Sequence, residues 1–439
     1  MLADCTLPNL SGFFASLRMT SLTRTKIFAR RTPCPPARSR GICGCIAWIR
    51  YNRSVFAHSI ALPAETDAAA WQALWPTLPT GAAVFALRGA AESSPSQPEA
   101  YIAKTANLRW RMQRLLMPEV GTSKRLRLTG RVQRLEYTQT GSDLETSLLL
   151  YRATRAAFGE RAHKRLHLRA PVVLRLAWEN AYPRVYAASR IARRSLEHTF
   201  GPFPSRVAAE RFLEEMLNLF LLRRCVDDLV PDPKFPGCVY SEMKMCLAPC
   251  FQGCTDSRYV EESTAVRNFL QTRGAGLLSR LEQEREQAAS ALEFERAAQA
   301  HARLQKAQAA AQLCPPLVHP LSKLDAVIVQ QAAPSLEPAP AVALFLLRAG
   351  RIFGPITSAV EQPALRVACA TLAAQAQSIA GNTEELVGHL ALLARWYYRP
   401  AAKRAGEIFF RAAEEEFPWT KILRGAQRVL VGGSEIAAS

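Results

Sequence analysis

The sequence predicts a mixed α/β fold joined to an α-helical hairpin. Strand and helix patterns alternate between Glu65 and Phe158, which is typical of a small α/β unit. Acids and bases alternate with alanine and leucine over Gln283–Lys306, the pattern of a two-helix hairpin. From Leu324 the patterns change back to strands, which predicts a small α+β region at the carboxyl end. A cysteine-rich segment, Cys225–Cys254, lies between unit and hairpin, so the expected fold class is α/β plus α with a metal-binding segment in the middle.

The predicted α/β unit contains three strands and three helices. The run Gly81–Leu87 (GAAVFAL) is uniformly apolar, which indicates a buried strand, and Arg131–Thr138 alternates as a half-buried strand does. Leu144–Phe158 has helical spacing, with the leucines of Leu148–Leu150 mostly inward. The remaining elements are the helix Glu65–Trp75, the strand Ala100–Ala103 and the basic helix Thr105–Leu116.

The rest of the chain is predicted with the same patterns. Ser205 has the side chain of an N-cap for an amphipathic helix that runs to Leu222. The helical spacing of Ser257–Lys306 is broken near Gly274. The further predicted elements are strand-like runs in Pro171–Ala187, a helix stop at Pro315–Pro316, strands Asp325–Gln330, Ala341–Leu347 and Arg351–Gly354 with a hairpin turn at Arg348–Gly350, and a helical tail Pro363–Tyr398. Residues after Pro400 show no clear pattern.

These patterns divide the chain into five regions. The first fifty residues are rich in Arg, Pro, Ser and Cys and have no periodicity, so we expect a disordered extension or one translated from upstream of the true start. The five regions are this extension at 1–60, the α/β unit at 61–170, a linker with the cysteine segment at 171–256, the helical hairpin at 257–312 and the α+β region at 313–439.

The net charge predicts a polyanionic partner. The 439 residues carry a formal charge of +19, with a sequence pI near 9.8. A chain this basic attracts nucleic acid or an anionic membrane surface, and basic residues gather in the α/β unit. No apolar run reaches the length of a membrane span, so we expect DNA and no membrane as partner, and a cytoplasmic location. The candidate phosphate-binding residues are Arg109, Arg114, Arg125 and Arg127.

The cysteine segment is the strongest chemical signal. Clustered thiols in a chain without signs of secretion are usually metal ligands and not disulfides. Cys246 and Cys250 are four residues apart, so a helical turn would point both sulfurs the same way. The spacing lacks the paired CxxC steps usual for structural zinc, and four thiolates also suit an iron–sulfur cluster. A group of buried free cysteines is the remaining alternative.

Three blocks of residues then point to a family. They are YIAKTANLRWR at Tyr101–Arg111, the segment Leu221–Cys250 with KMCLAPC at its end together with the turn Phe200–Ser205, and LEFERAA at Leu292–Ala298. With these blocks the chain resembles UvrC, the incision subunit of bacterial nucleotide excision repair. The resemblance implies a GIY-YIG-like nuclease domain, a [4Fe–4S] cluster and a helical hairpin of the UVR type that docks on UvrB. The implied cluster ligands are Cys225, Cys238, Cys246 and Cys250, with Cys254 as an extra cysteine and zinc as the alternative metal.

The implied nuclease site has departures from the family pattern. A GIY-YIG site uses tyrosine, phosphate-binding cations and a divalent metal held by a glutamate. Here Tyr101, Lys104 and Arg111 match. Phe85 stands where the first motif has tyrosine, and Leu150 stands where the metal glutamate belongs, or Tyr151 with a shift of one residue. Neither residue can bind Mg²⁺ or Mn²⁺, so we expect a degraded site.

The family also suggests roles for the hairpin and the carboxyl end. Leu292, Phe294, Glu295 and Ala298 are the implied partner-binding residues, with Phe294 as the apolar anchor. The alternative is a coiled segment packed on its own chain. We expect no second nuclease domain of the ribonuclease H type in residues 313–439. The implied function is DNA repair by binding DNA and a UvrB-like protein; the alternative is an active metal-dependent endonuclease that nicks damaged DNA.

Overall fold

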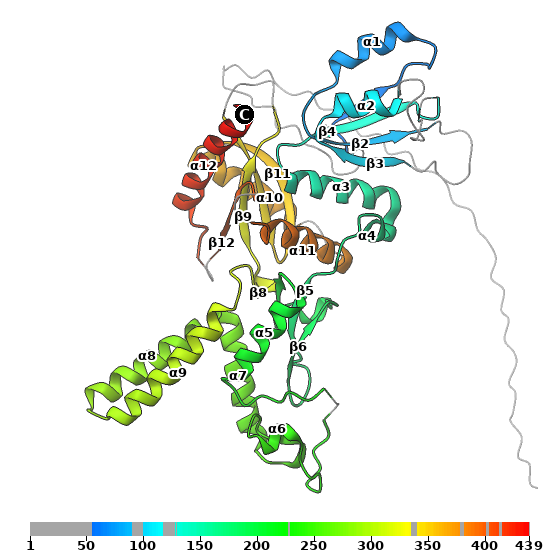
Figure 1. Cartoon of the computed structure of the whole chain (residues 1–439). Helices are drawn as coiled ribbons and strands as arrows, with labels where there is room; N and C mark the ends of the chain where they lie inside the picture. Colours follow the sequence, from blue (N-terminus) through cyan, green and yellow to red (C-terminus); the bar gives the residue numbers. More distant parts are fainter. Residues whose placement is uncertain are drawn as a thin grey trace, which may run out of the picture. The chain divides into compact units, whose positions relative to one another are not determined.

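The computed structural model describes residues 55–89, 100–116, 128, 130–226, 229–334, 340–377, 382–400, 404–411 and 415–438. All of them belong to one compact unit, Tyr51–Ser439. This part of the chain is mixed α/β, with three four-stranded antiparallel sheets (Figure 1). None of its helices combines the length and hydropathy that a membrane crossing requires.

The first sheet has strands in the order β1-β4-β2-β3. Their bounds are β1 His58–Ala61, β2 Ala83–Arg88, β3 Tyr101–Thr105 and β4 Arg134–Gln139. The helices α1 (Ala68–Thr77) and α2 (Leu108–Leu116) cover one face, where Trp71 and Met112 pack on Phe85. The helix α3 (Asp143–Phe158) covers the other face through Leu149, Leu150 and Ala153. Successive residues of β2 therefore serve two different cores, as strand alternation requires.

The predicted extension ends earlier than residue 60. Residues 58–61 form β1, which pairs with β4, and Phe56 is buried. The expectation of disorder is therefore wrong for these residues, while residues 1–54 lie outside the described part. The four residues HSIA are too few to show a strand pattern in the sequence. They form a strand because they pair with β4.

The second sheet has the order β6-β5-β7-β8 and forms the middle of the chain. Its strands are β5 Val172–Leu176, β6 Val185–Ala188, β7 Thr199–Phe203 and β8 His319–Pro320. The helix α5 (Arg206–Leu217) packs on it, and the side chain of Ser205 accepts a hydrogen bond from the Ala208 N–H at 3.1 Å, which confirms the predicted cap. The helix ends five residues before Leu222, because the chain turns there and the Leu221 N–H donates to Glu262 at 2.7 Å.

Three long helices follow the cysteine segment. They are α7 Asp256–Thr272, α8 Ala275–Ser290 and α9 Phe294–Gln312, after the short α6 Val239–Glu242 within the segment. The predicted break at Gly274 is confirmed by its left-handed φ of 88°. The helices α8 and α9 lie side by side as an antiparallel hairpin (Figure 1).

The third sheet has the order β11-β10-β9-β12 and lies between helices. Its strands are β9 Ala326–Gln331, β10 Ala341–Arg348, β11 Arg351–Ala359 and β12 Glu407–Phe410, and its helices are α10 Gln362–Gln377, α11 Thr383–Tyr397 and α12 Trp419–Ala438. Leu390 of α11 packs on one face, and Leu372 of α10 and Ile422 of α12 pack on the other. The predicted turn is confirmed, with left-handed φ values of 46° at Ala349 and 76° at Gly350.

The helix α3 also packs against the third region. Tyr151 is 1% exposed and shares one apolar core with Leu386 and Leu390 of α11. The Arg152 guanidinium donates to the carbonyl oxygens of Gly354 and Ile352 at 2.6 and 3.1 Å. The regions predicted as 61–170 and 313–439 therefore share a core, although they are far apart in sequence.

Candidate functional site

One face of the first sheet holds a tyrosine–arginine pair. Tyr101 begins β3, and Arg111 of α2 donates from Nη2 to the Tyr101 hydroxyl at 3.3 Å. Phe85 lies beneath this pair, fully buried, with its ring centroid 6.0 Å from that of Tyr101. The structure thus brings three of the predicted site residues together, and Phe85 contributes packing and no hydroxyl.

Lys104 lies on the opposite face of the same strand. Its Nζ is 3.4 Å from Asp143 Oδ1, and Asp143 Oδ2 is 2.6 Å from Arg399. Burial acts to raise the pKa of Asp143, but the two cations outweigh it and the net pKa lies below the ordinary value. The carboxylate nearest to the predicted site is therefore already neutralised by Lys104 and Arg399.

The predicted metal position is filled by packing residues. Leu150 packs against Val84 and Ala86 on the α3 face of the sheet. Tyr151 is buried in the core with α11, where its ring meets His389 edge-on at 5.7 Å. Leu150 thus lies on the sheet face opposite Tyr101 and Arg111, and Tyr151 packs away from the sheet against α11.

Glu145, in the first turn of α3, is a buried acid. It is 8% exposed, and its Oε2 accepts a hydrogen bond from the Gly141 N–H at 2.8 Å. Burial raises the pKa of Glu145, and the bond from Gly141 acts in the other direction. Its position in the first turn of α3 and its internal partner indicate a role in ordering the start of this helix.

The polar side of α2 contains an aromatic residue that sequence reasoning missed. Trp110 is 52% exposed, and the Arg114 guanidinium carbon lies 4.2 Å from its ring centroid. Arg109 instead donates to the carbonyl oxygens of Leu78 and Pro76 at 2.8 and 2.9 Å. Arg125 and Arg127 lie outside the described residues. The signal for Trp110 was the sequence RWR, an aromatic between cations on the polar side of a predicted helix.

The four predicted ligand cysteines influence one another, and Cys254 does not belong to the group. Burial raises the pKa of the Cys246 thiol, and the nearby thiols of Cys238, Cys250 and Cys225 raise it further. The pKa of Cys254 is raised by burial and by Asp256. All five thiols are half-buried and free. Among the described residues, however, no three His, Cys, Asp or Glu side chains are placed as a metal-holding group. The donor set fits a thiolate-bound metal, whereas the side chains as placed do not close around one.

The backbone of this segment is unusually strained. Lys244, Ala248 and Gln252 have left-handed φ values of 54°, 53° and 59°. Such a conformation costs roughly 1–2 kcal/mol for each non-glycine residue, so surrounding interactions must compensate. The expected helical turn between Cys246 and Cys250 is therefore wrong: Ala248 precedes Pro249, which disfavours the right-handed helical region at Ala248.

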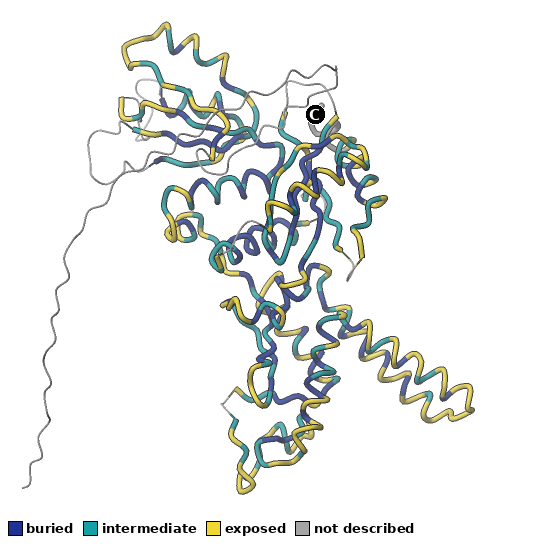
Figure 2. Tube along the Cα trace, turned by 180° about the vertical axis from the view of Figure 1, so that it is seen from behind, coloured by how far each residue is buried: buried dark blue, intermediate teal, exposed yellow. Residues whose placement is uncertain are grey.

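The tip of the α8–α9 hairpin is exposed. Leu292, with a left-handed φ of 60°, and Phe294 are each 71% exposed, and Glu295 and Ala298 are also exposed. The outer surfaces of both helices are open to solvent along their length (Figure 2). The base differs, because Leu281 and Leu304 pack there with Leu219. The four predicted partner-binding residues therefore lie together on a surface free of packing.

The middle of the chain matches a known family. Residues 172–269 match the family described as UvrC/Cho excinuclease, middle domain. The UvrABC system protein C of Idiomarina loihiensis is 30% identical over 208 residues, which are 45% of this chain and 32% of that protein. The protein of that name from Alcanivorax borkumensis is 29% identical over 208 residues (45% and 32%), and that from Symbiobacterium thermophilum is 27% identical over 260 residues (58% and 39%). No solved structure matches.

Fold and comparison together define a mixed α/β protein whose middle domain is of the UvrC/Cho excinuclease type. The matched part spans about a third of the length of the first two relatives. The match at residues 172–269 includes the cysteine block and confirms the resemblance to UvrC that this block carries.

Proposed function

We propose that this chain is a DNA-repair protein of the nucleotide excision type that binds DNA and a UvrB-like partner without cutting at its GIY-YIG-like site. The observation that carries this proposal is the contrast between two faces of one sheet. The Tyr101–Arg111 pair is present on one face, while Leu150, at the proposed metal position, packs on the other, and the alternative residue Tyr151 packs in the core with α11.

Metal-dependent cleavage needs oxygen ligands close to the scissile phosphate. The acids near the site are used otherwise: Asp143 pairs with Lys104 and Arg399, and Glu145 is buried against Gly141. An active Mg²⁺- or Mn²⁺-dependent endonuclease is the second candidate. It is favoured by the retained contact between the Tyr101 hydroxyl and Arg111, which has the chemistry of a nucleophile beside a phosphate-binding cation.

The exposed side of α2 supports DNA binding. Arg111 and Arg114 supply cations for phosphates, and Trp110 offers an open ring on which an unpaired base can stack. Because the cations of α2 would contact phosphates, we expect binding to depend on the nucleic-acid backbone and to weaken with salt.

Trp110→Ala is expected to weaken binding of single-stranded DNA about tenfold, because stacking one base contributes about 1–3 kcal/mol. The dependence of affinity on salt should not change, since the ring has no charge. Fluorescence anisotropy of a labelled oligonucleotide over a series of salt concentrations measures both quantities. Trp110→Phe is the matched control and should keep most of the affinity. Equal affinity of wild type and Trp110→Ala would show that Trp110 does not contact the DNA.

The hairpin tip supports docking of a UvrB-like protein. Leu292 and Phe294 are large apolar side chains that are exposed to water in the free protein. Their hydration is unfavourable, so covering them with a partner contributes favourably to the free energy of binding. Glu293 and Arg296 pair beside them at 3.0 Å, which gives the apolar tip a polar rim.

Phe294→Ala is expected to weaken binding to UvrB at least tenfold, which corresponds to about 1.4 kcal/mol or more. Its melting temperature should stay within about 2 °C of wild type, because the ring is exposed and stabilises no core. Calorimetric titration with purified UvrB measures the affinity. Val207→Ala, which alters another exposed apolar side chain, on α5, is the control. If both variants bind like wild type, the tip is not the docking surface.

Cys225, Cys238, Cys246 and Cys250 are proposed to hold a [4Fe–4S] cluster, with zinc as the alternative. Bound there, either metal centre would cross-link the segment through four thiolates. The function proposed here requires no redox step from it. The chain's own contribution is the strained loop that holds these thiols within electrostatic reach of one another. The cross-links would compensate the cost of that backbone.

A further inference from the structure

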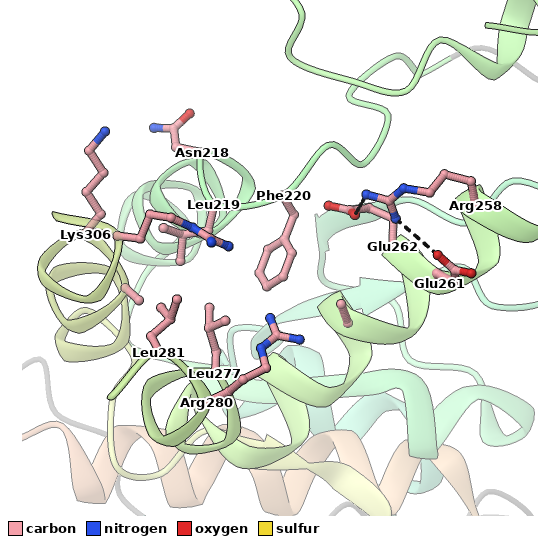
Figure 3. A pocket seen from close by; sticks show the side chains of 13 residues that line it. Asn218, Leu219, Phe220, Arg258, Glu261, Glu262, Leu277, Arg280, Leu281 and Lys306 are labelled. Carbon is pink, nitrogen blue, oxygen red and sulfur yellow. Dashed lines mark ion pairs between the residues drawn. The ribbon is translucent and has the colours of Figure 1, made fainter. Parts of the chain in front are cut away.

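A pocket opens where the hairpin base meets the middle domain. It has a volume of about 470 Å³ and lies between the carboxyl end of α5, the helix α7 and the first turns of α8 facing the end of α9 (Figure 3). We name it the hairpin-base pocket. The lining residues used below are Leu219, Phe220, Leu277, Arg280, Arg303 and Lys306.

The walls of the hairpin-base pocket have an excess of positive charge. Arg280 of α8 and Arg303 and Lys306 of α9 line it, and neither Arg280 nor Lys306 has an ion-pair partner among the described residues. Arg303 has only Glu284, at 3.7 Å and outside the pocket. These cations come from both helices of the hairpin, so the pocket depends on hairpin assembly.

A single cation, Arg258, pairs with both acids of the pocket, so one negative charge there stands against the three cations Arg280, Arg303 and Lys306. Arg258 pairs with Glu262 at 3.0 Å and with Glu261 at 3.7 Å, as the dashed lines in Figure 3 show. Glu262 also accepts the Leu221 N–H at 2.7 Å and is 8% exposed. Its carboxylate links the segment after α5 to α7 through the contact with Leu221. The remaining charge available to a ligand is therefore positive.

The floor of the pocket is apolar and fixed. Phe220 packs edge-on against Phe269, with ring centroids 5.6 Å apart, and Leu277 points toward Phe220 from the other side (Figure 3). Leu219 and Leu277 also contact the cluster of Leu281, Leu304 and Ala307 at the hairpin base. Flexible cations thus surround a rigid apolar surface.

We propose that the hairpin-base pocket binds a phosphate group of a nucleic-acid strand, a second contact in addition to the one on α2. Guanidinium groups offer paired donors that match phosphate oxygens, and a lysine adds a point charge. The apolar floor beside them suits the sugar or base attached to that phosphate. An acidic protein segment would not place an apolar group next to each negative charge in this way. This inference deepens the DNA binding proposed above and rests on it.

The test compares two triple variants of the full chain with equal loss of charge. One is Arg280→Ala/Arg303→Ala/Lys306→Ala; the control is Arg211→Ala/Lys234→Ala/Lys323→Ala, which removes exposed cations outside the pocket. Anisotropy of a labelled single-stranded oligonucleotide is followed over a series of KCl concentrations. The pocket variant should bind at least tenfold more weakly, and its slope of log K against log salt should fall by about 1–2, given about 0.7 for each single-strand phosphate contact. The control should change affinity less than threefold.

The outcomes separate this inference from the function on which it rests. If the wild type does not bind the oligonucleotide, both are overturned. If the wild type binds, Arg111→Ala/Arg114→Ala weakens binding and the pocket variant behaves like its control, only the pocket inference is overturned. A labelled poly-glutamate peptide forms the last arm: loss of its binding by the same factor in the pocket variant would assign the pocket to an acidic protein and overturn the nucleic-acid assignment.

Discussion

Gly388→Ala is expected to destabilise the protein by about 1–3 kcal/mol, because a methyl group there overpacks a buried core. A Cβ at Gly388 of α11 would overlap the Tyr151 hydroxyl and ring, with Cε2 only 2.8 Å away. Tyr151 is 1% exposed and is held between His163 and His389, each edge-on at 5.7 Å, so its ring has no free space to enter. Thermal or urea unfolding measures the change.

A double-mutant cycle makes this expectation specific. Tyr151→Leu by itself should lower the free energy of unfolding. In the Tyr151→Leu background, however, Gly388→Ala should destabilise the protein by over about 1 kcal/mol less than it does in the wild type, because the ring is absent. Gly276→Ala is the matched control, since a Cβ there meets only Thr272 atoms at 3.5 and 3.7 Å on an exposed helix. It should be neutral or slightly stabilising. Additive effects of the two core changes would contradict the packing of α3 on α11.

This core bears on catalysis. Tyr151 is one of the two residues proposed to stand at the position of the family's metal glutamate, and it connects α3 with α11. A carboxylate at 151 would be buried among apolar side chains, which disfavours its charged form. The packing of Tyr151 against α11 therefore supports the proposal that this position does not hold a metal.

Cys250→Ser is expected to remove the proposed metal centre and to make the strained segment around it accessible to proteases. Anaerobically purified wild type should contain about four iron atoms per chain and absorb visible light. The variant should lose most of the iron, and limited proteolysis should then cut between Cys225 and Cys254, because the left-handed residues lose their compensation. Iron analysis and mass spectrometry of the fragments measure both effects.

Cys254→Ser is the control within the same segment. Burial and the neighbouring Asp256 raise the pKa of its thiol, and Cys254 is not one of the four proposed ligands, so iron content and protease resistance should be unchanged. A colourless wild type that contains zinc would contradict the iron–sulfur assignment. Equal metal loss in both serine variants would contradict the separation of Cys254 from the four ligands.

Elements with strong local patterns could be predicted from the sequence. The apolar run of β2, the capped helix α5 and the hairpin α8–α9 lie where the patterns placed them, within a few residues. The strands β1 and β12 could not be predicted, because each has four residues and is ordered by pairing with β4 or β9. The helix α12 contains adjacent glycines at 432 and 433, which weaken its helical signal.

The candidate site was only partly predictable. The block Tyr101–Arg111 brought the right residue types together, but Tyr101 and Lys104 are three apart in a strand and so lie on opposite faces. That alternation was visible in the sequence. The pairing of Lys104 with Asp143 and Arg399 was not, since Arg399 is nearly 300 residues away in the chain and only the tertiary fold brings it there.

The central claim is binding without cleavage, and a nicking assay tests it most directly. A supercoiled plasmid with lesions is incubated with the chain, UvrB, and Mg²⁺ or Mn²⁺, next to Arg111→Ala. We expect no nicked circles above the Arg111→Ala background, while the same wild-type preparation binds the plasmid in a salt-dependent manner. Nicking by the wild type that Arg111→Ala abolishes would contradict the central claim and establish the active endonuclease.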